Sequence, residues 1–331
     1  MKKLICTLLV LLLTVSCIAG ASASADKKIN IVTTIFPIYD WVREITGDTL
    51  SDIGLTMLLD SGTDLHSYQP SAQDILKVSS ADLFIHVGGE SDKWVEGVLA
   101  SAMNPDLRKI SLVEAMGEDI KMEEIVEGME HDHDHDEEEH DHEEEDHDHE
   151  EEEADEHVWL SLRNAEKFVY VISEAMADID PENAGTYRNN AAAYIEKLAA
   201  LDTEYAQAVD SAAYSTLLFG DRFPFRYLAD DYGLDYFAAF SGCSAETEAS
   251  FQTVVFLAQK TDELDLPAVL TIENTKTRIA ETIVSTAKKK DLKILVMNSM
   301  QGTTSSDVKA GATYLGIMES NLDVLKEALN R

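Results

Sequence analysis

The sequence is short of cysteine, proline and basic residues. Its 331 residues include three cysteines, six prolines and 26 lysines and arginines, against 63 aspartates and glutamates. The formal net charge of −37 excludes nucleic acid as a partner, because a phosphate backbone attracts the opposite sign. Cys243 is the only cysteine beyond the N-terminal segment, so the folded part of the chain cannot form an intramolecular disulfide.

Short motifs for nucleotide binding and hydrolysis are also absent. The chain contains no GxxxxGK loop, no GxGxxG after a strand, no HExxH and no GxSxG. Nucleotide-dependent and hydrolytic chemistry therefore lack support, and we expect a binding protein rather than an enzyme.

The N-terminus has the pattern of a secretory signal peptide, which we assign to residues 1–25. Two lysines precede an apolar run from Leu4 to Val15, which is too short to span a membrane. Cys17 follows Thr14, Val15 and Ser16 in a sequence that resembles a lipobox, whereas Ala23–Ala25 forms an alternative small-x-small cleavage site. We favour lipidation of Cys17, which predicts a membrane-anchored lipoprotein on the outer face of the plasma membrane or in the periplasm.

The apolar pattern predicts an α/β fold in two halves. Buried-strand patterns alternate with amphipathic helical patterns on both sides of one long helical stretch that lacks glycine and proline between residues 186 and 209. The predicted divisions are an N-terminal lobe over residues 26–162, a helical segment over 163–212 and a C-terminal lobe over 213–331. A ligand site in such a chain is expected in the crevice at the carboxyl ends of the strands.

An acidic insertion over about residues 128–155 interrupts the first lobe. From Glu130 to Glu156 there are 19 acidic residues and no lysine or arginine, so this stretch cannot bury a core. Seven histidines alternate with the acids without fixed geometry, which predicts weak individual binding and collective collection of cations. A purely solubilising role is the alternative. These histidines are His131, His133, His135, His140, His142, His147 and His149.

Two other histidines occupy more specific positions. His66 lies in a polar loop between a predicted strand and a predicted helix, and His157 lies where the acidic run gives way to the apolar segment VWLSL. Imidazoles from two separate loops are good ligands for zinc, and they also suit manganese when carboxylates complete the site.

Six segments together resemble the zinc and manganese substrate-binding lipoproteins of bacterial ABC transporters, the ZnuA-like group. They are TDLHSYQPSAQDI, EHVWLSLRNA, RYLADDYGL, CSAETEAS, IAETI and YLGIMESNLDVLKEAL. The resemblance implies two (β/α)4-type lobes with parallel-rich sheets, joined by one long rigid helix, with a metal ion between them. It places the family's first two histidine ligands on His66 and His157.

The resemblance also shows where this chain departs from the family. The position of the third ligand, a histidine or glutamate, falls on Arg222, and the late aspartate falls on Asn298. Arginine cannot bind a cation, because it stays protonated and offers only donors. Arg222 could instead hold a neighbouring carboxylate. The substitutes considered for the missing ligands are His86, Asp221, Glu246 and Cys243.

The sequence therefore predicts a monomeric extracytoplasmic receptor that captures Zn²⁺, with Mn²⁺ as the alternative. The resemblance implies a membrane permease and an ATPase as partners, with the histidine-rich loop as an accessory collector. The alternatives are a cell-surface zinc buffer or adhesin, a metallohydrolase with Glu246 as base, and an oxyanion receptor that uses Arg222.

Overall fold

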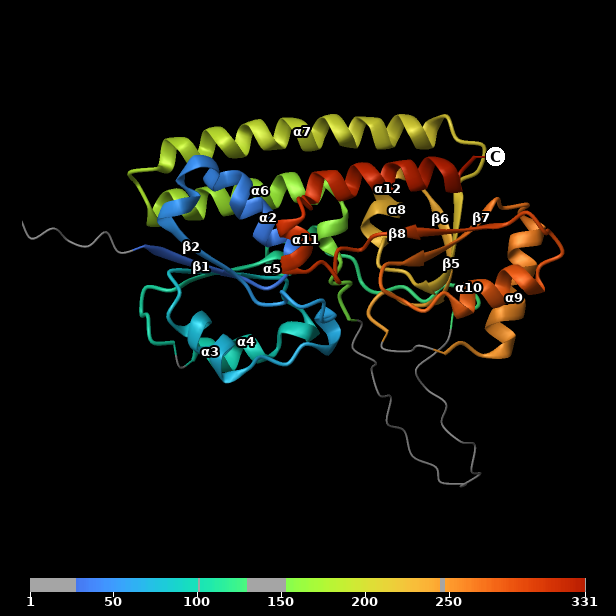
Figure 1. Cartoon of the computed structure of the whole chain (residues 1–331), viewed down its shortest axis with the longest axis horizontal. Coiled ribbons are helices and arrows are strands. Elements are labelled where there is room, and N and C mark those ends of the chain that lie inside the picture. Colours follow the sequence, from blue (N-terminus) through green and yellow to red (C-terminus); the bar gives the residue numbers. More distant parts are fainter. Residues whose placement is uncertain (1–27, 101, 130–152, 245–247, 331) are drawn as a thin grey trace, which may run out of the picture.

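Two parallel sheets lie side by side beneath a layer of long helices (Figure 1). The computed structural model describes residues 28–100, 102–129, 153–244 and 248–330. Within these ranges each sheet has four strands, and every strand pair is parallel. The predicted α/β fold with two parallel-sheet lobes is confirmed.

The N-terminal sheet has the strand order β2-β1-β3-β4. Its strands are β1 (Ile29–Thr33), β2 (Ile53–Met57), β3 (Leu83–His86) and β4 (Arg108–Ser111). The helices of this lobe are α2 (Phe36–Thr46), α3 (Ala72–Ser79), α4 (Trp94–Leu99) and α5 (Leu112–Met116). Helices α3 and α4 lie on the face of the sheet opposite the long helices (Figure 1).

The C-terminal sheet has the order β6-β5-β7-β8, with the same pattern of connections as the first. Its strands are β5 (Thr216–Arg222), β6 (Asp235–Phe240), β7 (Ala268–Ile272) and β8 (Lys293–Met297). The helices are α8 (Arg226–Tyr232), α9 (Phe251–Glu263), α10 (Arg278–Thr286), α11 (Ser305–Lys309) and α12 (Tyr314–Ala328).

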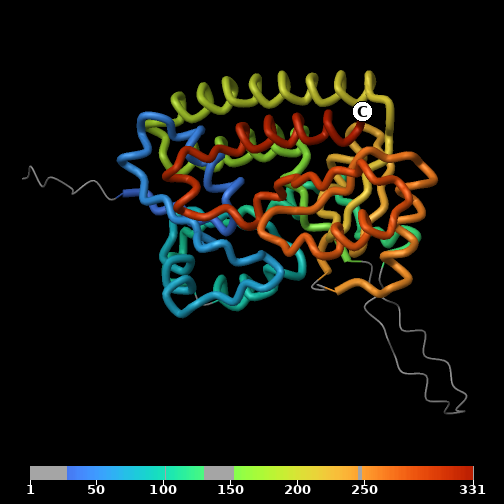
Figure 2. Tube along the Cα trace, turned by 45° about the vertical axis from the view of Figure 1, so that its right-hand side comes forward, coloured from blue at the N-terminus to red at the C-terminus, as the bar shows by residue number. Residues whose placement is uncertain are grey.

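Helices α6 (Leu162–Ile179) and α7 (Ala184–Asp210) link the two lobes. The 27 residues of α7 span about 40 Å at 1.5 Å per residue. This helix packs against α2 of the first lobe and against α8 and α12 of the second. The long helix expected from the sequence is therefore present, and it reaches over both sheets (Figure 2).

The C-terminal helix α12 returns to the helical layer and contacts the N-terminal lobe. The backbone N–H of Tyr314 donates to Oδ2 of Asp40 on α2 at 2.7 Å, and the rings of Tyr314 and Trp41 meet edge to face at 5.1 Å. The Tyr205 hydroxyl on α7 donates to the carbonyl of Met318 at 2.6 Å. The packing of α12 on α2 and α7 thus adds to the connection that the long helix α7 makes between the two lobes.

The acidic insertion begins and ends in segments that belong to the folded part. Met129 is buried, and the N–H of Glu123 donates to the carbonyl of Glu153 at 2.8 Å. Asp155 and Glu156 are buried as well. Residues 130–152, which include the seven repeated histidines, lie outside the described residues, as do Cys17 and Glu246.

Among the helices of the described residues, none combines the length and the apolar character that crossing a membrane requires.

Candidate metal centre

His66 lies in a tight turn that is fixed by the residue two positions before it. The 3-10 turn Leu65–Ser67 follows β2, and Asp64 caps it by accepting the His66 backbone N–H at 3.0 Å. Nδ1 of His66 lies 2.9 Å from Oγ of Ser91 and 3.5 Å from Oε2 of Glu156. These groups adjoin Nδ1, so Nε2 on the other side of the ring is the nitrogen that remains for a metal ion.

His157 is held in the same manner. Oδ1 of Asp155 accepts both the backbone N–H of His157 at 2.9 Å and its ring Nδ1–H at 3.0 Å. The next residues form the buried 3-10 turn Val158–Leu160. The His157 side chain is completely buried, and its ring orientation is fixed by the Asp155 carboxylate. Nε2 of His157 is therefore the ring nitrogen that remains for a metal ion.

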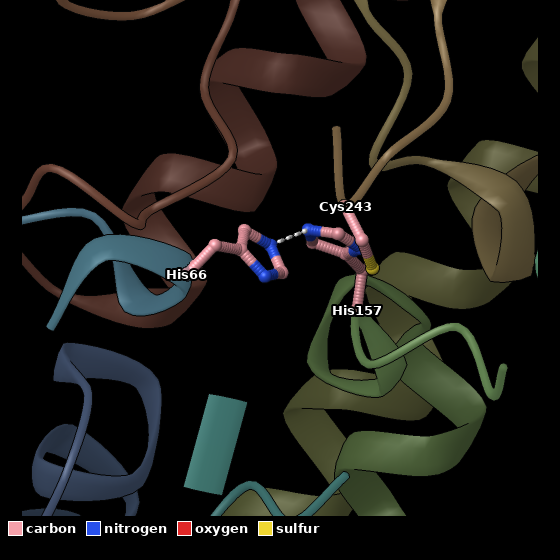
Figure 3. A group of neighbouring side chains, drawn as sticks. All are labelled: His66, His157 and Cys243. Atoms are coloured by element: carbon pink, nitrogen blue, oxygen red, sulfur yellow. Dashed lines mark hydrogen bonds between the residues drawn. The ribbon is translucent and has the colours of Figure 1, made fainter. Parts of the chain in front are cut away.

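The Nε2 atoms of the two histidines face each other. Nε2 of His66 lies 3.3 Å from Nε2 of His157, with the ring centroids 5.2 Å apart (Figure 3). Tetrahedral zinc with bonds of about 2.05 Å to nitrogen holds two such nitrogens about 3.3 Å apart. Burial, followed by the neighbouring His157, lowers the pKa of His66 to about 3, so this imidazole is neutral at physiological pH. The pair has the spacing of two metal ligands.

Cys243 is the third member of this group. One ligand atom each from His66, His157 and Cys243 lies within 4.8 Å of the other two, and the three side chains converge from different segments of the chain (Figure 3). The N–H of Cys243 donates to Oε1 of Glu123 at 2.7 Å, which anchors the loop after β6. Burial, and then the charges of nearby carboxylates, raise the pKa of the Cys243 thiol well above its ordinary value.

Gly242 allows the Cys243 loop to approach the histidine. A Cβ atom at position 242 would lie 3.0 Å from the Phe223 carbonyl oxygen and 3.1 Å from both Cε1 and Nδ1 of His157. These distances are shorter than most real Cβ contacts. Glycine therefore places the backbone before Cys243 directly against the imidazole of His157.

Arg222 pairs with a carboxylate of the other lobe. Its guanidinium donates to Oδ2 of Asp64 at 2.6 Å and to the carbonyl of Ser244 at 3.3 Å. Burial alone would raise the pKa of Asp64, but the Arg222 charge offsets this and lowers the pKa below its ordinary value. Arg222 thus connects the turn that carries His66 with the loop that carries Cys243.

Gln301 brings an amide group to the same point. In the orientation that satisfies its hydrogen bonds, Nε2 donates to the two Asp64 oxygens at 2.9 and 3.1 Å, and Oε1 lies 2.7 Å from Nε2 of His157. Asp64 therefore directs a neutral oxygen of Gln301 toward the histidine pair. The loop that holds Gln301 is fixed by Glu273, whose carboxylate accepts from Ser299 and Gly302.

The other expected ligands are engaged elsewhere. Asp221 accepts from Thr275 at 2.6 Å, from the Ile272 N–H at 3.2 Å and from the Arg222 N–H at 2.9 Å. Nδ1 of His86 lies 3.2 Å from Asp92. Oδ1 of Asn298 accepts the N–H of Met300 at 2.7 Å. Within the described residues, the structure groups none of these side chains with the His66 and His157 pair.

Sequence reasoning missed the residues that support the histidines. Asp64 precedes His66 by two positions, and Asp155 precedes His157 by two positions. This repeated Asp-x-His pattern was a readable signal, because both aspartates accept the backbone N–H of their histidine. Gln301 gave no comparable signal, since an isolated glutamine is an ordinary surface residue.

The fold and the histidine pair agree with a known family. The family model described as "Zinc-uptake complex component A periplasmic", ZnuA, matches residues 31–328. The chain belongs to the ZnuA family. The "High-affinity zinc uptake system protein ZnuA" of Bacillus subtilis matches this chain over nearly the full length of both proteins. The two are 30% identical over 324 residues, which cover 98% of this chain and 95% of the relative.

Longer relatives of the ZnuA family match over part of their length. The "Zinc-binding lipoprotein AdcA" of Streptococcus pneumoniae is 34% identical over 307 residues, which cover 93% of this chain and 57% of the relative. The chain thus spans little more than half the length of that protein. The crystal structure of its Zn(II)-bound ZnuA-like domain matches with a TM-score of 0.69 and 30% identity, covering 92% of this chain and all of that domain.

A second similar structure is the metal-dependent lipoprotein YcdH of Bacillus subtilis. It matches with a TM-score of 0.72 and 26% identity, covering 91% of this chain and 99% of that one. The shared two-lobed architecture extends over the described lobes of this ZnuA-family chain.

Proposed function

We propose that this protein is an extracytoplasmic receptor that captures Zn²⁺ between its two lobes and delivers it to the permease of an ABC importer. One observation carries the proposal: buried Nε2 atoms of His66 and His157 face each other at 3.3 Å, each with its Nδ1 held by an acidic or hydroxyl partner. Relatives named for zinc binding and zinc uptake support the same assignment.

Zn²⁺ is favoured over Mn²⁺ by the kind of ligands at the centre. The group consists of two imidazoles and a sulfur, whereas Mn²⁺ prefers carboxylate and water oxygens. The buried carboxylates of Asp155 and Glu156 face the Nδ1 atoms rather than the shared point between the Nε2 atoms. A receptor role also fits the family better than hydrolysis, since no motif of the chain supplies a hydrolytic site.

The remaining parts of the proposal concern location and capture. Cys17 would carry a lipid that holds the monomeric receptor at the outer face of the membrane, beside a permease driven by an ATPase. The seven repeated histidines would collect Zn²⁺ weakly and raise its concentration near the cleft. His66 and His157 would then bind one ion specifically.

Calorimetric titration with Zn²⁺ tests the central claim on three proteins. They are the wild type, a variant with all seven repeated histidines changed to glutamine, and His66→Ala in that seven-glutamine background. Glutamine substitution keeps the chain length and leaves Met129 and Glu153 in place, which a deletion would not. We expect one tight Zn²⁺ in the seven-glutamine variant and its loss in His66→Ala. Tight binding that survives His66→Ala would refute the interlobe site.

Transport needs a separate measurement. Zinc uptake by cells at limiting Zn²⁺ should fall when the gene is deleted and should return with the wild-type gene but not with His66→Ala. Unchanged uptake in the deletion strain would limit the protein to metal binding without transport.

A further inference from the structure

We propose that the Cys243 thiolate is the third ligand of the metal, which makes the centre a His2Cys site selective for zinc and other borderline or soft cations over manganese. The inference rests on the proposed function and deepens it, because it concerns the composition and selectivity of the same site. It assigns a ligand type that the two histidines alone do not determine.

The geometry places the sulfur within reach of the same ion. The sulfur and the two imidazole nitrogens all lie within 4.8 Å of one another. A tetrahedral zinc with bonds of about 2.3 Å to sulfur and 2.05 Å to nitrogen would hold the sulfur about 3.6 Å from each nitrogen. A movement on the order of an ångström therefore closes the site. Figure 3 shows Cys243 beside His157, with His66 approaching from the opposite side.

The backbone around Cys243 is constrained on both sides of the residue. Gly242 lies against the His157 ring, where a Cβ would come within 3.1 Å of Nδ1. The Cys243 N–H is held by Glu123 at 2.7 Å, and the carbonyl of Ser244 accepts from Arg222 at 3.3 Å. Gly242, Cys243 and Ser244 are thus each positioned by a neighbouring group. These contacts orient the Cys243 side chain toward the two histidines.

Other residues near the expected third position are excluded by their chemistry or their contacts. Arg222 offers only donors and pairs with Asp64 at 2.6 Å. Asp221 accepts three hydrogen bonds within its own lobe. Gln301 offers a neutral oxygen, which suits a fourth position but supplies no negative charge. Within the described part of the chain, Cys243 is the anionic ligand that the geometry brings to the two histidines.

The bond that forms determines which cation is preferred. The thiol loses its proton to solvent, and the resulting thiolate donates an electron pair to the metal, with no change in oxidation state. Thiolate ligands favour Zn²⁺ over Mn²⁺, whose preferred ligands are carboxylate, carbonyl and water oxygens. The buried acids Asp155 and Glu156 remain at the far side of the imidazoles, where they orient them.

Cobalt substitution gives a direct test, because Co²⁺ bound to a thiolate produces a charge-transfer absorption in the near ultraviolet. The parent protein is the full chain with Cys6 and Cys17 changed to serine and the seven repeated histidines changed to glutamine, so that Cys243 is its only thiol. We expect one bound Co²⁺ with this absorption. In Cys243→Ser the absorption should disappear, and in His66→Ala tight binding should be lost.

The outcomes separate the two proposals. One Co²⁺ bound tightly by the parent without the charge-transfer absorption would refute Cys243 as a ligand while leaving the receptor function intact. If the parent does not bind Co²⁺ tightly, or if His66→Ala binds it as tightly as the parent does, both the receptor proposal and this inference are wrong. Thermal unfolding of the metal-free variants serves as the control for folding.

Selectivity gives a second, independent readout. Affinities for Zn²⁺ and Mn²⁺ should be measured by chelator competition on the parent, Cys243→Ser and Cys243→Ala. Losing a partner that supports a metal ligand weakens binding by up to about 100-fold, so loss of the Cys243 ligand itself should weaken Zn²⁺ binding by at least about 100-fold. Mn²⁺ binding should change less than about tenfold, because Mn²⁺ gains little from a thiolate. Equal losses for both cations, or no loss for zinc, would contradict the inference.

Discussion

At the scale of single residues, the proposed metal centre depends on side chains outside the group of His66, His157 and Cys243. Asp64 and Asp155 occupy equivalent positions before the two histidines, and each accepts the backbone N–H of its histidine. They differ in their second contact, because Asp155 also holds the ring of His157, whereas Asp64 pairs with Arg222. One aspartate therefore fixes an imidazole, and the other connects the lobes.

Asp155→Asn should weaken zinc binding by about 10- to 100-fold, because the neutral amide would no longer hold Nδ1–H of His157 with a full negative charge. Chelator competition with Zn²⁺ would measure this in the seven-glutamine background. Asp180→Asn is a suitable control, since Asp180 is a partly buried acid at the opposite end of α6, where it accepts from the Tyr187 hydroxyl at 2.6 Å. An equal loss in both variants would point to a general charge effect instead.

Arg222→Met should lower the free energy of unfolding by about 1 to 2 kcal/mol in the metal-free protein. The substitution leaves the Asp64 carboxylate partly buried without the Arg222 charge. Because both side chains are partly exposed to solvent, the loss of stability should be smaller than for breaking a fully buried ion pair. Urea unfolding would measure the change. Arg222→Lys keeps the charge and should lose less. If the Arg222→Met variant is as stable as the wild type, the Arg222–Asp64 pair contributes nothing to the free energy of unfolding.

The sequence singled out His66 and His157, and the structure brings their rings together, while their role as ligands stays a prediction. Cys243 was one of several candidates, and Gln301 was not predicted. His66 and His157 stand in motifs whose local sequence fixes their turns. Cys243 and Gln301 reach the centre only through the packing of distant loops, and no local pattern encodes such a meeting. The sequence could exclude Arg222 as a ligand, yet its partner proved to be Asp64, more than 150 residues away.

At the scale of elements, the contact between α2 and α12 joins the beginning of the chain to its end. Asp40 on α2 is buried and accepts both the Tyr314 N–H at the start of α12 and a hydrogen bond from Arg43. Burial raises the pKa of Asp40 from its ordinary 3.8 to about 6. The charged form of this carboxyl therefore carries a cost in the folded state.

This cost predicts a pH dependence of stability. The folded state binds the Asp40 proton more tightly than the unfolded state, so the contribution of Asp40 is most favourable below about pH 4 and declines as pH rises to about 6. The shift corresponds to up to about 3 kcal/mol. Asp40→Asn should lack this decline, and the wild type should lose stability relative to it between these pH values. A difference that is constant with pH would contradict the raised pKa.

The arrangement of the elements was only partly encoded in local sequence. The stretch without glycine or proline predicted α7, because helix propensity accumulates along an uninterrupted run. The docking of α12 on α2 was not predicted, since it depends on one buried carboxylate meeting a helix start 274 residues later. Periodicity identifies which face of a helix is buried but not the partner that covers it.

At the scale of the whole molecule, the helical layer constrains how the lobes can move. Helix α7 packs on α2, α6, α8 and α12, and the Trp159 indole donates to the carbonyl of Ser299 at 2.9 Å beside the metal centre. We therefore expect little rotation of the lobes on metal binding. Small-angle scattering of the seven-glutamine variant with and without Zn²⁺ should give radii of gyration that agree within error. A clear contraction would indicate hinge closure.

The uneven charge of the molecule should influence capture more than final affinity. About half of the net charge of −37 comes from residues 130–156. Changing Glu137–Glu139 and Glu143–Glu145 to glutamine keeps the histidines and should slow Zn²⁺ capture at low ionic strength several-fold, with an unchanged equilibrium affinity. Stopped-flow rates should converge at high salt, where the field is screened over about 3 Å. Rates that differ equally at all salt concentrations would exclude steering.

Within the described part of the chain, His66, His157, Cys243 and Gln301 come from turns and loops, and Arg222 is the last residue of β5. His66 lies within one 3-10 turn, His157 immediately precedes another, and Cys243 and Gln301 follow the last residues of β6 and β8. We therefore expect one or two loop substitutions to change the cation selectivity with little effect on the stability of the two sheets and the long helices. This separation makes the scaffold evolvable: a lineage facing a different metal supply can change its cargo without having to refold its receptor.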